Sequence, residues 1–133
     1  PPETYPPPPP DDCRYCGADV DLVTQEEFYG QSYDGGGRLY VCRSCHARVG
    51  VHGPETSHPD DAPLGLLANA ELRHLRSEVH DLFDPMWQEH GTDRQQAYDF
   101  FFGKMLQVPE HRRHVGMLTE EECRTAIRIL KEQ

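Results

Sequence analysis

The chain has 133 residues, and its 13 Lys and Arg against 23 Asp and Glu give a formal net charge of −10. A chain of this length folds as one domain or as two very small ones. No stretch approaches the roughly 20 apolar residues that span a bilayer, so no membrane association is expected. The acidic balance also counts against a protein that wraps nucleic-acid phosphates.

Residues 1–12 form a Pro-rich segment in which Pro6 to Pro10 follow one another without a break. Consecutive prolines fix φ and lack amide donors, so we expect an extended polyproline II tail. Such a tail is either a solvated spacer, which we favour, or a docking ligand for an aromatic groove. No basic stretch followed by an apolar one resembles a secretory signal, and a cytoplasmic location is therefore expected.

Residues 13–52 have a different sequence pattern, in which single apolar and aromatic residues are spaced among Gly, Asp and Ser. This pattern is typical of short strands joined by loops, and Gly35-Gly36-Gly37 predicts a hairpin tip between them. Residues 53–63 contain three prolines and are predicted to form a linker.

Two CxxC motifs, Cys13-x-x-Cys16 and Cys42-x-x-Cys45, lie in this segment with 25 residues between them. A tight turn places both thiolates of one motif on the same cation, and two such turns complete a tetrahedron around zinc. Four thiolates leave no open coordination position, so we predict one structural zinc. A domain of about 40 residues buries too little apolar area to fold alone, and the metal supplies the missing free energy.

Other arrangements of these cysteines stay open. They could form disulfides or a redox CxxC, although a redox motif would normally lie in a βαβ unit, which the sequence does not indicate. Iron suits the same tetrahedral geometry as zinc, and His46, His52 or His58 could replace one cysteine as a ligand. The fifth cysteine, Cys123, lies on the apolar face of the last predicted helix, where we expect a buried hydrophobe rather than a reactive thiol.

From residue 64 onward the apolar residues recur with helical spacing, which predicts a helical domain over residues 64–133. Asp84-Pro85 predicts the end of the first helix and a short continuation. Capping-box patterns at Thr92-x-x-Gln95 and Thr119-x-x-Glu122 predict the starts of the second and third helices. The apolar stripe of the first helix comprises Leu72, Leu75, Val79, Leu82 and Phe83; that of the second, Tyr98, Phe101, Phe102, Met105 and Leu106; and that of the third, Cys123, Ala126, Ile127 and Leu130.

The predicted fold class is therefore α+β, with a small zinc-ribbon-like β knuckle domain over residues 13–52 followed by a three-helix α domain over residues 64–133.

Several segments in both halves resemble a known family. They are Cys-Arg-Tyr-Cys-Gly (13–17), Tyr-Val-Cys-Arg-Ser-Cys-His-Ala-Arg-Val-Gly-Val-His (40–52), Pro-Leu-Gly-Leu-Leu-Ala (63–68), Leu-Arg-His-Leu-Arg (72–76), His-Asp-Leu-Phe-Asp-Pro-Met-Trp (80–87) and His-Val-Gly-Met-Leu (114–118). In this order they look like a family of small zinc-finger-containing proteins of unknown function, encoded by bacteriophages and some bacteria. The resemblance covers nearly everything after the proline tail, which departs from the family. It implies a zinc site at the four cysteines and no catalytic activity.

Basic and aromatic residues outside the cysteine motifs are candidates for partner binding. Residues 36–53 carry three arginines and no acid, so they form the one clearly basic island. Helical geometry places Phe100 off the stripe of the second helix, and an exposed Phe100 would indicate a partner-binding patch. The alternative for the arginines is ion pairing with nearby carboxylates, which we favour. The candidates are Arg38, Arg43, Arg48, Arg73, Arg76, Phe100, Arg112 and Arg113.

His80 and Asp84 lie four residues apart, on one face of a helix that extends this far. With His114 they could form a second metal site or an acid–base pair. The alternative is a set of ordinary hydrogen bonds, which we favour because these residues lack the spacing of a ligand set.

These observations favour a non-enzymatic zinc-binding interaction module, such as a phage accessory or regulatory factor that binds a host or phage protein. The alternative is a nucleic-acid-binding zinc ribbon that uses the basic second knuckle. A third reading is a nuclease of the histidine–asparagine–histidine type, because residues 41–46 superficially resemble its second zinc knuckle. That enzyme needs a histidine just before this knuckle to activate water, and residues 31–41 contain none.

Overall fold

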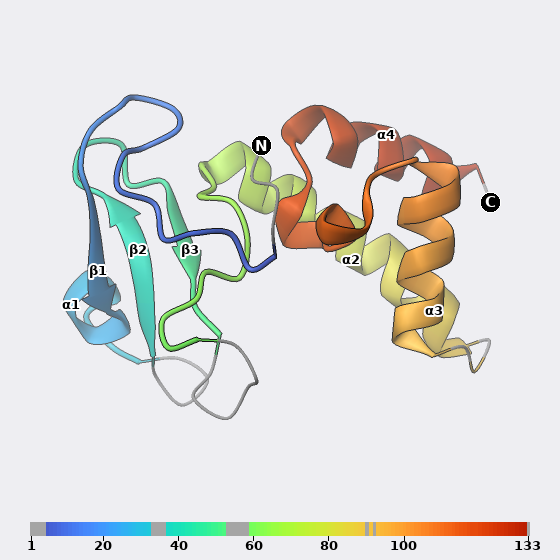
Figure 1. The fold of residues 1–133 in the computed structure, drawn as a ribbon, viewed down its shortest axis with the longest axis horizontal. Helices are drawn as coiled ribbons and strands as arrows, with labels where there is room; N and C mark the ends of the chain where they lie inside the picture. The colour runs from blue at the N-terminus through green and yellow to red at the C-terminus, as the bar shows by residue number, and fades with distance from the viewer. Residues whose placement is uncertain (1–4, 33–36, 53–58, 90, 92, 133) are drawn as a thin grey trace. The chain divides into compact units, whose positions relative to one another are not determined.

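A computed structural model of the chain describes residues 5–32, 37–52, 59–89, 91 and 93–132 (Figure 1). The chain divides into two compact units, Pro1–Asn69, called the ribbon unit below, and Ala70–Gln133, called the helical unit. In the described residues, no helix is both long enough and apolar enough to cross a membrane. A small sheet in the first unit and helices in the second confirm the predicted α+β class.

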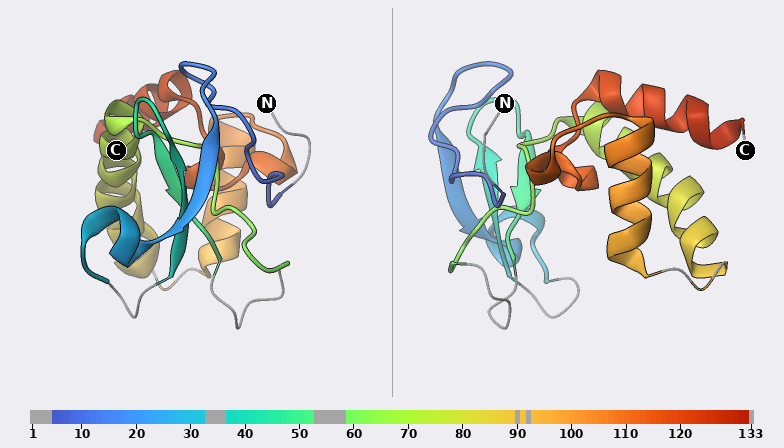
Figure 2. Two further views of the ribbon diagram at one scale, coloured as in Figure 1. Left: turned by 90° about the vertical axis from the view of Figure 1, so that its left-hand side faces the viewer. Right: turned by 45° about the vertical axis from the view of Figure 1, so that its right-hand side comes forward.

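The ribbon unit is built on a three-stranded antiparallel sheet of strand order β1-β2-β3. The strands are β1 (Val20–Thr24), β2 (Arg38–Cys42) and β3 (Arg48–Gly50). The short helix α1 (Gln25–Tyr29) follows β1 directly and lies at one end of this strand (Figures 1 and 2). Its start is fixed by a capping box, in which the Thr24 hydroxyl accepts the Glu27 N–H and the Glu27 carboxylate accepts the Thr24 N–H, both at 3.1 Å.

Strand pairing brings the second CxxC motif into the core of the ribbon unit. Val20 pairs with Cys42 and Leu22 pairs with Tyr40, so these four alternate residues point to one face of the sheet. The buried cluster on that face takes in residues from the first knuckle, two strands and a later segment: Cys13, Tyr40, Cys42, Ala47, Val49 and Leu67. Both CxxC motifs thus contribute a cysteine to one core.

The segment after β3 belongs to the ribbon unit, although residues 53–63 were predicted to be a linker and residue 64 the start of the helical domain. Residues 53–58 lie outside the described part. The Ala62 carbonyl accepts the His52 N–H at 2.9 Å, and the Leu64 N–H donates to the Gly50 carbonyl at 3.0 Å. Pro63 lacks an amide donor, but its two neighbours make these bonds, so a proline is tolerated beside the strand. The helical unit consequently begins at Ala70, later than predicted.

The Pro-rich segment was expected to be a solvated tail; part of it, including Tyr5 and Pro7, instead packs on the ribbon unit, while Pro8 and Pro9 are exposed. Pro7 is buried. The Tyr5 hydroxyl hydrogen-bonds His52 Nε2 at 3.3 Å, and the two rings meet edge to face with centroids 5.8 Å apart. The Val20 N–H donates to the Asp11 carbonyl at 3.0 Å, which ties the end of the segment to β1. Neighbouring aromatic and backbone groups therefore determine its path.

The helical unit has three main helical regions joined by short turns. In chain order its elements are α2 (Ala70–Glu89), α3 (Arg94–Tyr98), the π-helix η1 (Asp99–Met105), the 3-10 turns η2 (Glu110–Arg112) and η3 (Val115–Met117), and α4 (Glu120–Lys131). Cys123 is buried on the apolar face of α4, as predicted. Burial raises the pKa of its thiol to about 11, which suits a hydrophobic side chain rather than a reactive nucleophile.

Helix α2 runs through Pro85, so the predicted helix end at Asp84-Pro85 is wrong. A proline inside a helix removes the bond to the carbonyl four residues earlier. That residue is Asp81, which is exposed, as is Pro85, so water can solvate the freed carbonyl. Asp84 also accepts the indole N–H of Trp87 at 3.1 Å, which links side chains on the two sides of the proline.

The second helix begins differently from the prediction. Its N-cap is Asp93, whose carboxylate accepts the Gln95 N–H at 2.7 Å, while Thr92 lies outside the described residues. After Tyr98 the helix widens to π geometry, in which the Leu106 N–H donates to the Phe101 carbonyl at 3.0 Å. One part of the core of the unit is an aromatic cluster with ring centroids 5.0–5.5 Å apart, formed by Phe83, Tyr98, Phe101 and Phe102.

Helix α4 begins at the predicted capping box, in which Thr119 accepts the Glu122 N–H at 3.3 Å and the Glu122 carboxylate accepts the Thr119 N–H at 2.9 Å.

Thr119→Ala is expected to lower the free energy of unfolding of the helical unit by about 1 kcal/mol, because it leaves an amide at the helix start without its acceptor. Thr119→Ser keeps the acceptor and is the matched control. Urea unfolding followed by far-UV circular dichroism measures the difference, and equal midpoints for the two variants would contradict it.

Candidate metal centre

The first CxxC motif forms a tight turn closed by two backbone hydrogen bonds. The Gly17 N–H donates to the Cys13 carbonyl at 2.9 Å, and the Cys13 N–H donates to the Ala18 carbonyl at 2.8 Å. Gly17 has φ of 79°, in the left-handed region that glycine enters without steric cost. The chain therefore reverses directly after Cys16, and both sulfurs of the motif lie on one side of the turn.

The second CxxC motif repeats this geometry. The His46 N–H donates to the Cys42 carbonyl at 3.2 Å, and the Cys42 N–H donates to the Ala47 carbonyl at 2.9 Å. His46 takes the place of Gly17 and has φ of 63°. A residue with a Cβ pays roughly 1–2 kcal/mol for this conformation. The two turns are otherwise equivalent, which is what a tetrahedral ion needs from its two pairs of ligands.

The two turns bring four sulfurs together. The Sγ atoms of Cys13, Cys16, Cys42 and Cys45 all lie within 4.8 Å of one another. Between the turns, the Sγ atoms of Cys13 and Cys45 lie 3.6 Å apart, and those of Cys16 and Cys42 lie 3.4 Å apart. Four sulfurs at about 2.3 Å from zinc lie roughly 3.8 Å apart, so this donor set fits the ion. Disulfides, with sulfurs about 2.05 Å apart, do not describe it.

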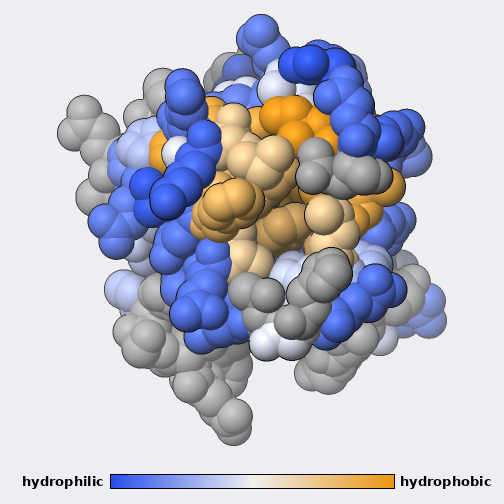
Figure 3. Space-filling model, turned by 90° about the vertical axis from the view of Figure 1, so that its right-hand side faces the viewer, coloured by the Kyte–Doolittle hydropathy of each residue, from blue (hydrophilic) through white to orange (hydrophobic). Residues whose placement is uncertain are grey.

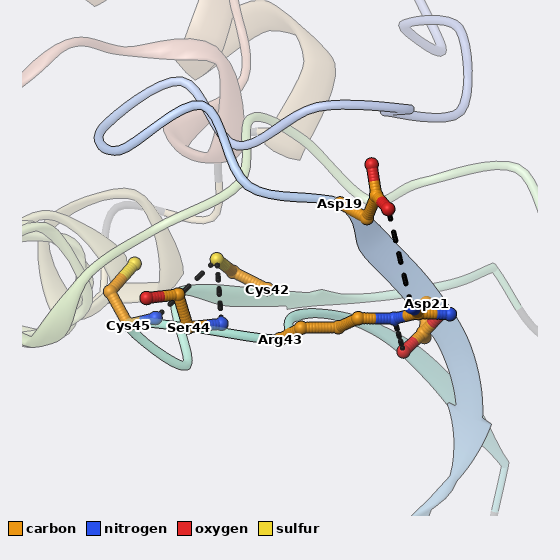
Figure 4. A network of polar contacts seen from close by, with 6 residues as sticks. All are labelled: Asp19, Asp21, Cys42, Arg43, Ser44 and Cys45. Atoms are coloured by element: carbon orange, nitrogen blue, oxygen red, sulfur yellow. Dashed lines mark hydrogen bonds and ion pairs between the residues drawn. The ribbon is translucent and has the colours of Figure 1, made fainter.

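Backbone amides of the turns stabilise the sulfurs in their thiolate form. The N–H groups of Ser44 and Cys45 both donate to Cys42 Sγ at 3.4 Å (Figure 4). In the first turn the Tyr15 N–H donates to Cys13 Sγ at 3.4 Å. Cys13 and Cys42 are buried, at 4% and 0% exposure. The metal site is therefore continuous with the core of the ribbon unit.

The surroundings of two of the cysteines, Cys42 and Cys45, shift their pKa values in opposite directions. The Cys45 N–H lowers the pKa of Cys42 to about 6, assisted by the Ser44 N–H and against the effect of burial. The Ala47 N–H lowers the pKa of Cys45, but loss of water and the neighbouring thiols outweigh it and raise this pKa to about 11. In the metal-free protein Cys42 therefore gives up its proton more readily than Cys45, and zinc must displace the protons that the four sulfurs still hold.

Zinc affinity is expected to fall with decreasing pH, and to fall more steeply below about pH 6. Above that pH the Cys42 sulfur is already deprotonated, whereas below it zinc has one more proton to displace, because the pKa of Cys42 is about 6. Each displaced proton lowers the apparent affinity about tenfold per pH unit. Competition with a chromophoric chelator across this range measures the slope, and a slope unchanged through pH 6 would contradict the assignment of Cys42.

The histidines considered as substitute ligands lie elsewhere or outside the described residues. The His46 ring packs edge to face on Phe28, with centroids 5.8 Å apart, and His52 contacts Tyr5. His58 lies outside the described part. Within the described part, the four cysteines are the one group of three or more Cys, His, Asp or Glu side chains close enough to hold a metal.

The proposed second site around His80, Asp84 and His114 does not form a metal-binding group among the described residues. His80 Nδ1 and Asp84 Oδ2 form an i,i+4 pair at 3.1 Å on α2, as their spacing predicts. Asp84 uses its second oxygen for Trp87. The ordinary hydrogen-bonding alternative therefore describes this pair.

The arginines of the basic island have partners within the ribbon unit. Arg38 pairs with Asp61 at 2.7 Å. Arg43 makes two hydrogen bonds to the Asp21 carboxylate, at 2.7 and 2.9 Å, and its side chain extends from the second knuckle to β1, with Asp19 beside it (Figure 4). The pKa of Asp21 is lowered by these hydrogen bonds from Arg43. Arg48 lies over the Phe28 ring, 5.0 Å from its centroid.

In the helical unit, the candidate arginines are paired or half-buried, whereas Phe100 is exposed. Arg76 donates to the Gly116 carbonyl at 2.7 Å, and Arg73 is half-buried on α2. Arg112 pairs with Glu122, and Arg113 with Asp99 at 3.5 Å. Phe100 is 58% exposed, as predicted. Figure 3 shows a face on which apolar side chains gather in a patch, with hydrophilic residues along several of its edges.

A pocket that the sequence analysis missed lies beside the second knuckle. It has a volume of about 170 Å³ and is bounded by residues from β1, α1, β2 and the knuckle: Asp21, Val23, Glu27, Phe28, Val41, Cys42, Arg43 and His46. The capping box Thr24-x-x-Glu27 was a local signal for the helix that forms one wall. The sequence contains no comparable local signal for the strand register that places Asp21 opposite Val41.

Comparison with known proteins agrees with this geometry. The model of a family described as a zinc-finger-containing domain matches residues 9–133, which is nearly the whole chain. No curated protein and no solved structure gives a significant match. The two equivalent cysteine turns explain the family description, since they supply the four sulfurs of one zinc ion. The chain therefore belongs to this family of zinc-finger-containing domains.

Proposed function

We propose that this protein is a non-enzymatic zinc-binding interaction module that binds another protein. The observation that carries the proposal is the closed donor set, in which four cysteine sulfurs from two equivalent turns surround one position. A zinc ion held by four thiolates has no coordination position left for water or substrate, and serves to fix the fold. The ribbon unit then presents a surface whose shape depends on the ion.

Exposed apolar groups support recognition of a protein. Phe100 is 58% exposed and Met105 is 36% exposed, both on η1. Contiguous exposed apolar surface rimmed by polar residues is typical of protein-binding sites. An accessory or regulatory factor of the kind that bacteriophages encode, acting on a host or phage protein in the reducing cytoplasm, fits a small acidic protein with a thiolate zinc site.

Nucleic-acid binding through the second knuckle is the less favoured function. The three arginines of the basic island are engaged by Asp61, by Asp21 and by the aromatic rings of α1, so phosphates would compete with these groups. Binding driven by phosphates also weakens steeply as salt rises. A titration with DNA or RNA at two salt concentrations would therefore separate this function from protein binding.

Affinity capture with the zinc-loaded chain tests the proposal. Lysate treated with nuclease is passed over the immobilised chain, and each retained protein is purified and mixed with the chain again. We expect one protein that forms a defined complex with the zinc-loaded chain and not with the chelator-treated chain. Retention of nucleic acid alone, from lysate without nuclease, would contradict protein binding.

A further inference from the structure

The pocket beside the second knuckle has apolar walls and an acidic rim. Val23 and Val41 lie on the same face of the β1–β2 pair, because Val41 pairs with Asp21 two residues before Val23. Phe28 of α1 closes one side. The volume of about 170 Å³ is below the roughly 300 Å³ at which sites for small-molecule ligands begin, and it has room for a single amino-acid side chain.

The charges at the rim favour a cation. Glu27 uses one carboxylate oxygen to accept the Thr24 N–H, and a carboxylate has acceptor sites beyond that one bond. The cation at the rim, Arg43, is held by Asp21 through two hydrogen bonds and has Asp19 4.0 Å away. The charge of Arg43 is thus already balanced, and the charge of Glu27 remains for a ligand.

The rest of the ribbon unit strengthens this preference. It carries four Arg and no Lys against eleven Asp and Glu, a formal charge of −7 in 69 residues. Four thiolates around a divalent ion add a further charge of about −2, and the pocket adjoins Cys42, whose side chain lies on the opposite, core face of the sheet. A low-dielectric concavity of one sign focuses the field and attracts opposite charge.

We infer that this pocket binds a lysine side chain of a basic segment on the partner protein. A lysine has a compact charge on a flexible four-carbon stem, so its stem can lie along Val23, Val41 and Phe28 while its ammonium group meets Glu27. Such side chains bury the stem and keep the charge at the surface. This inference rests on the proposed function and names the chemistry of the partner.

The test uses the zinc-loaded full chain, labelled with 15N, and two five-residue capped peptides that differ at one position. One peptide has lysine between pairs of alanines, and the other has norleucine, which keeps the stem and lacks the charge. We expect the lysine peptide to bind with a Kd on the order of 1 mM and to shift the amide signals of Val23, Glu27, Phe28 and His46. The norleucine peptide is expected to shift none of them.

Two variants locate the charge that matters. Glu27→Gln removes the carboxylate charge but keeps the helix cap, because glutamine serves in a capping box as glutamate does. Glu26→Gln removes a neighbouring exposed charge outside the pocket. We expect Glu27→Gln to weaken binding of the lysine peptide at least fivefold and Glu26→Gln to change it less than twofold. For the wild-type chain, we expect the affinity for the lysine peptide to fall as the salt concentration rises.

Equal binding of the two peptides, equal effects of the two variants, or no binding of the lysine peptide would each overturn the inference. These failures are distinguishable from failure of the proposed function. A captured partner that binds the full chain while the lysine peptide does not would leave the interaction module standing and remove only this pocket. Absence of any protein complex in the capture experiment would remove the proposed function itself.

Discussion

Replacing Cys42 with serine is expected to abolish zinc binding and unfold the ribbon unit while the helical unit keeps its helices. Cys42 is fully buried in the core of the ribbon unit and is a member of the four-sulfur group. Structural zinc contributes roughly 10–16 kcal/mol of apparent binding free energy in small zinc domains. That range matches or exceeds the total folding stability of about 5–15 kcal/mol that a domain has. No other interaction in the ribbon unit can therefore replace the free energy that zinc binding contributes.

Zinc content and 15N-correlated NMR spectra measure this outcome together. In the Cys42→Ser variant, signals of β1, β2 and β3 should collapse to unfolded positions, whereas those of α2 and α4 should stay dispersed. Cys123→Ala is the matched control, because it also removes a buried cysteine but one in the helical unit, and it should keep one zinc per chain. Retention of zinc and of strand signals by Cys42→Ser would contradict the prediction.

Replacing Phe102 with alanine is expected to have the largest effect in the helical unit. Phe102 is 0% exposed, and its ring lies 5.0–5.5 Å from those of Phe83, Tyr98 and Phe101. Truncating a buried phenylalanine costs about 3–5 kcal/mol, since the transfer free energy is lost and a cavity is left. The aromatic contacts add to that cost.

Urea unfolding followed by far-UV circular dichroism measures the cost, with Phe100→Ala as its control. Phe100 precedes the buried pair in the same π-helix but is 58% exposed, so its truncation should change the free energy of unfolding by less than about 0.5 kcal/mol. Zinc content should be unchanged in both variants. Similar destabilisation by the two substitutions would show that the aromatic cluster is not part of the core.

The cysteine site could be predicted from the sequence because its chemistry is local. Each CxxC turn fixes two ligands within four residues, and the tetrahedral requirement leaves one way to combine two such turns. The apolar stripes on α2 and α4 were visible for the same reason, since helical spacing is a short-range pattern. The capping box at Thr119 also lies within one turn of the chain.

The features that the sequence did not reveal depend on contacts between distant residues. The path of the Pro-rich segment depends on Tyr5 meeting His52, and the pairing of residues 62–68 with β3 depends on neighbours that make the bonds Pro63 lacks. Helix α2 continues through Pro85 because the carbonyl that loses its partner belongs to an exposed residue. The pocket at Glu27 exists only once the strand register is set.

Zinc K-edge X-ray absorption of the purified full chain, combined with elemental analysis, tests the central claim most directly. We predict one zinc per chain, surrounded by four sulfur atoms at about 2.3 Å and by no nitrogen or oxygen ligand. A first shell that contains nitrogen or oxygen would show that the donor set is open. Protein free of bound metal that keeps a folded ribbon unit would contradict the claim that the four cysteines hold this unit together through one ion.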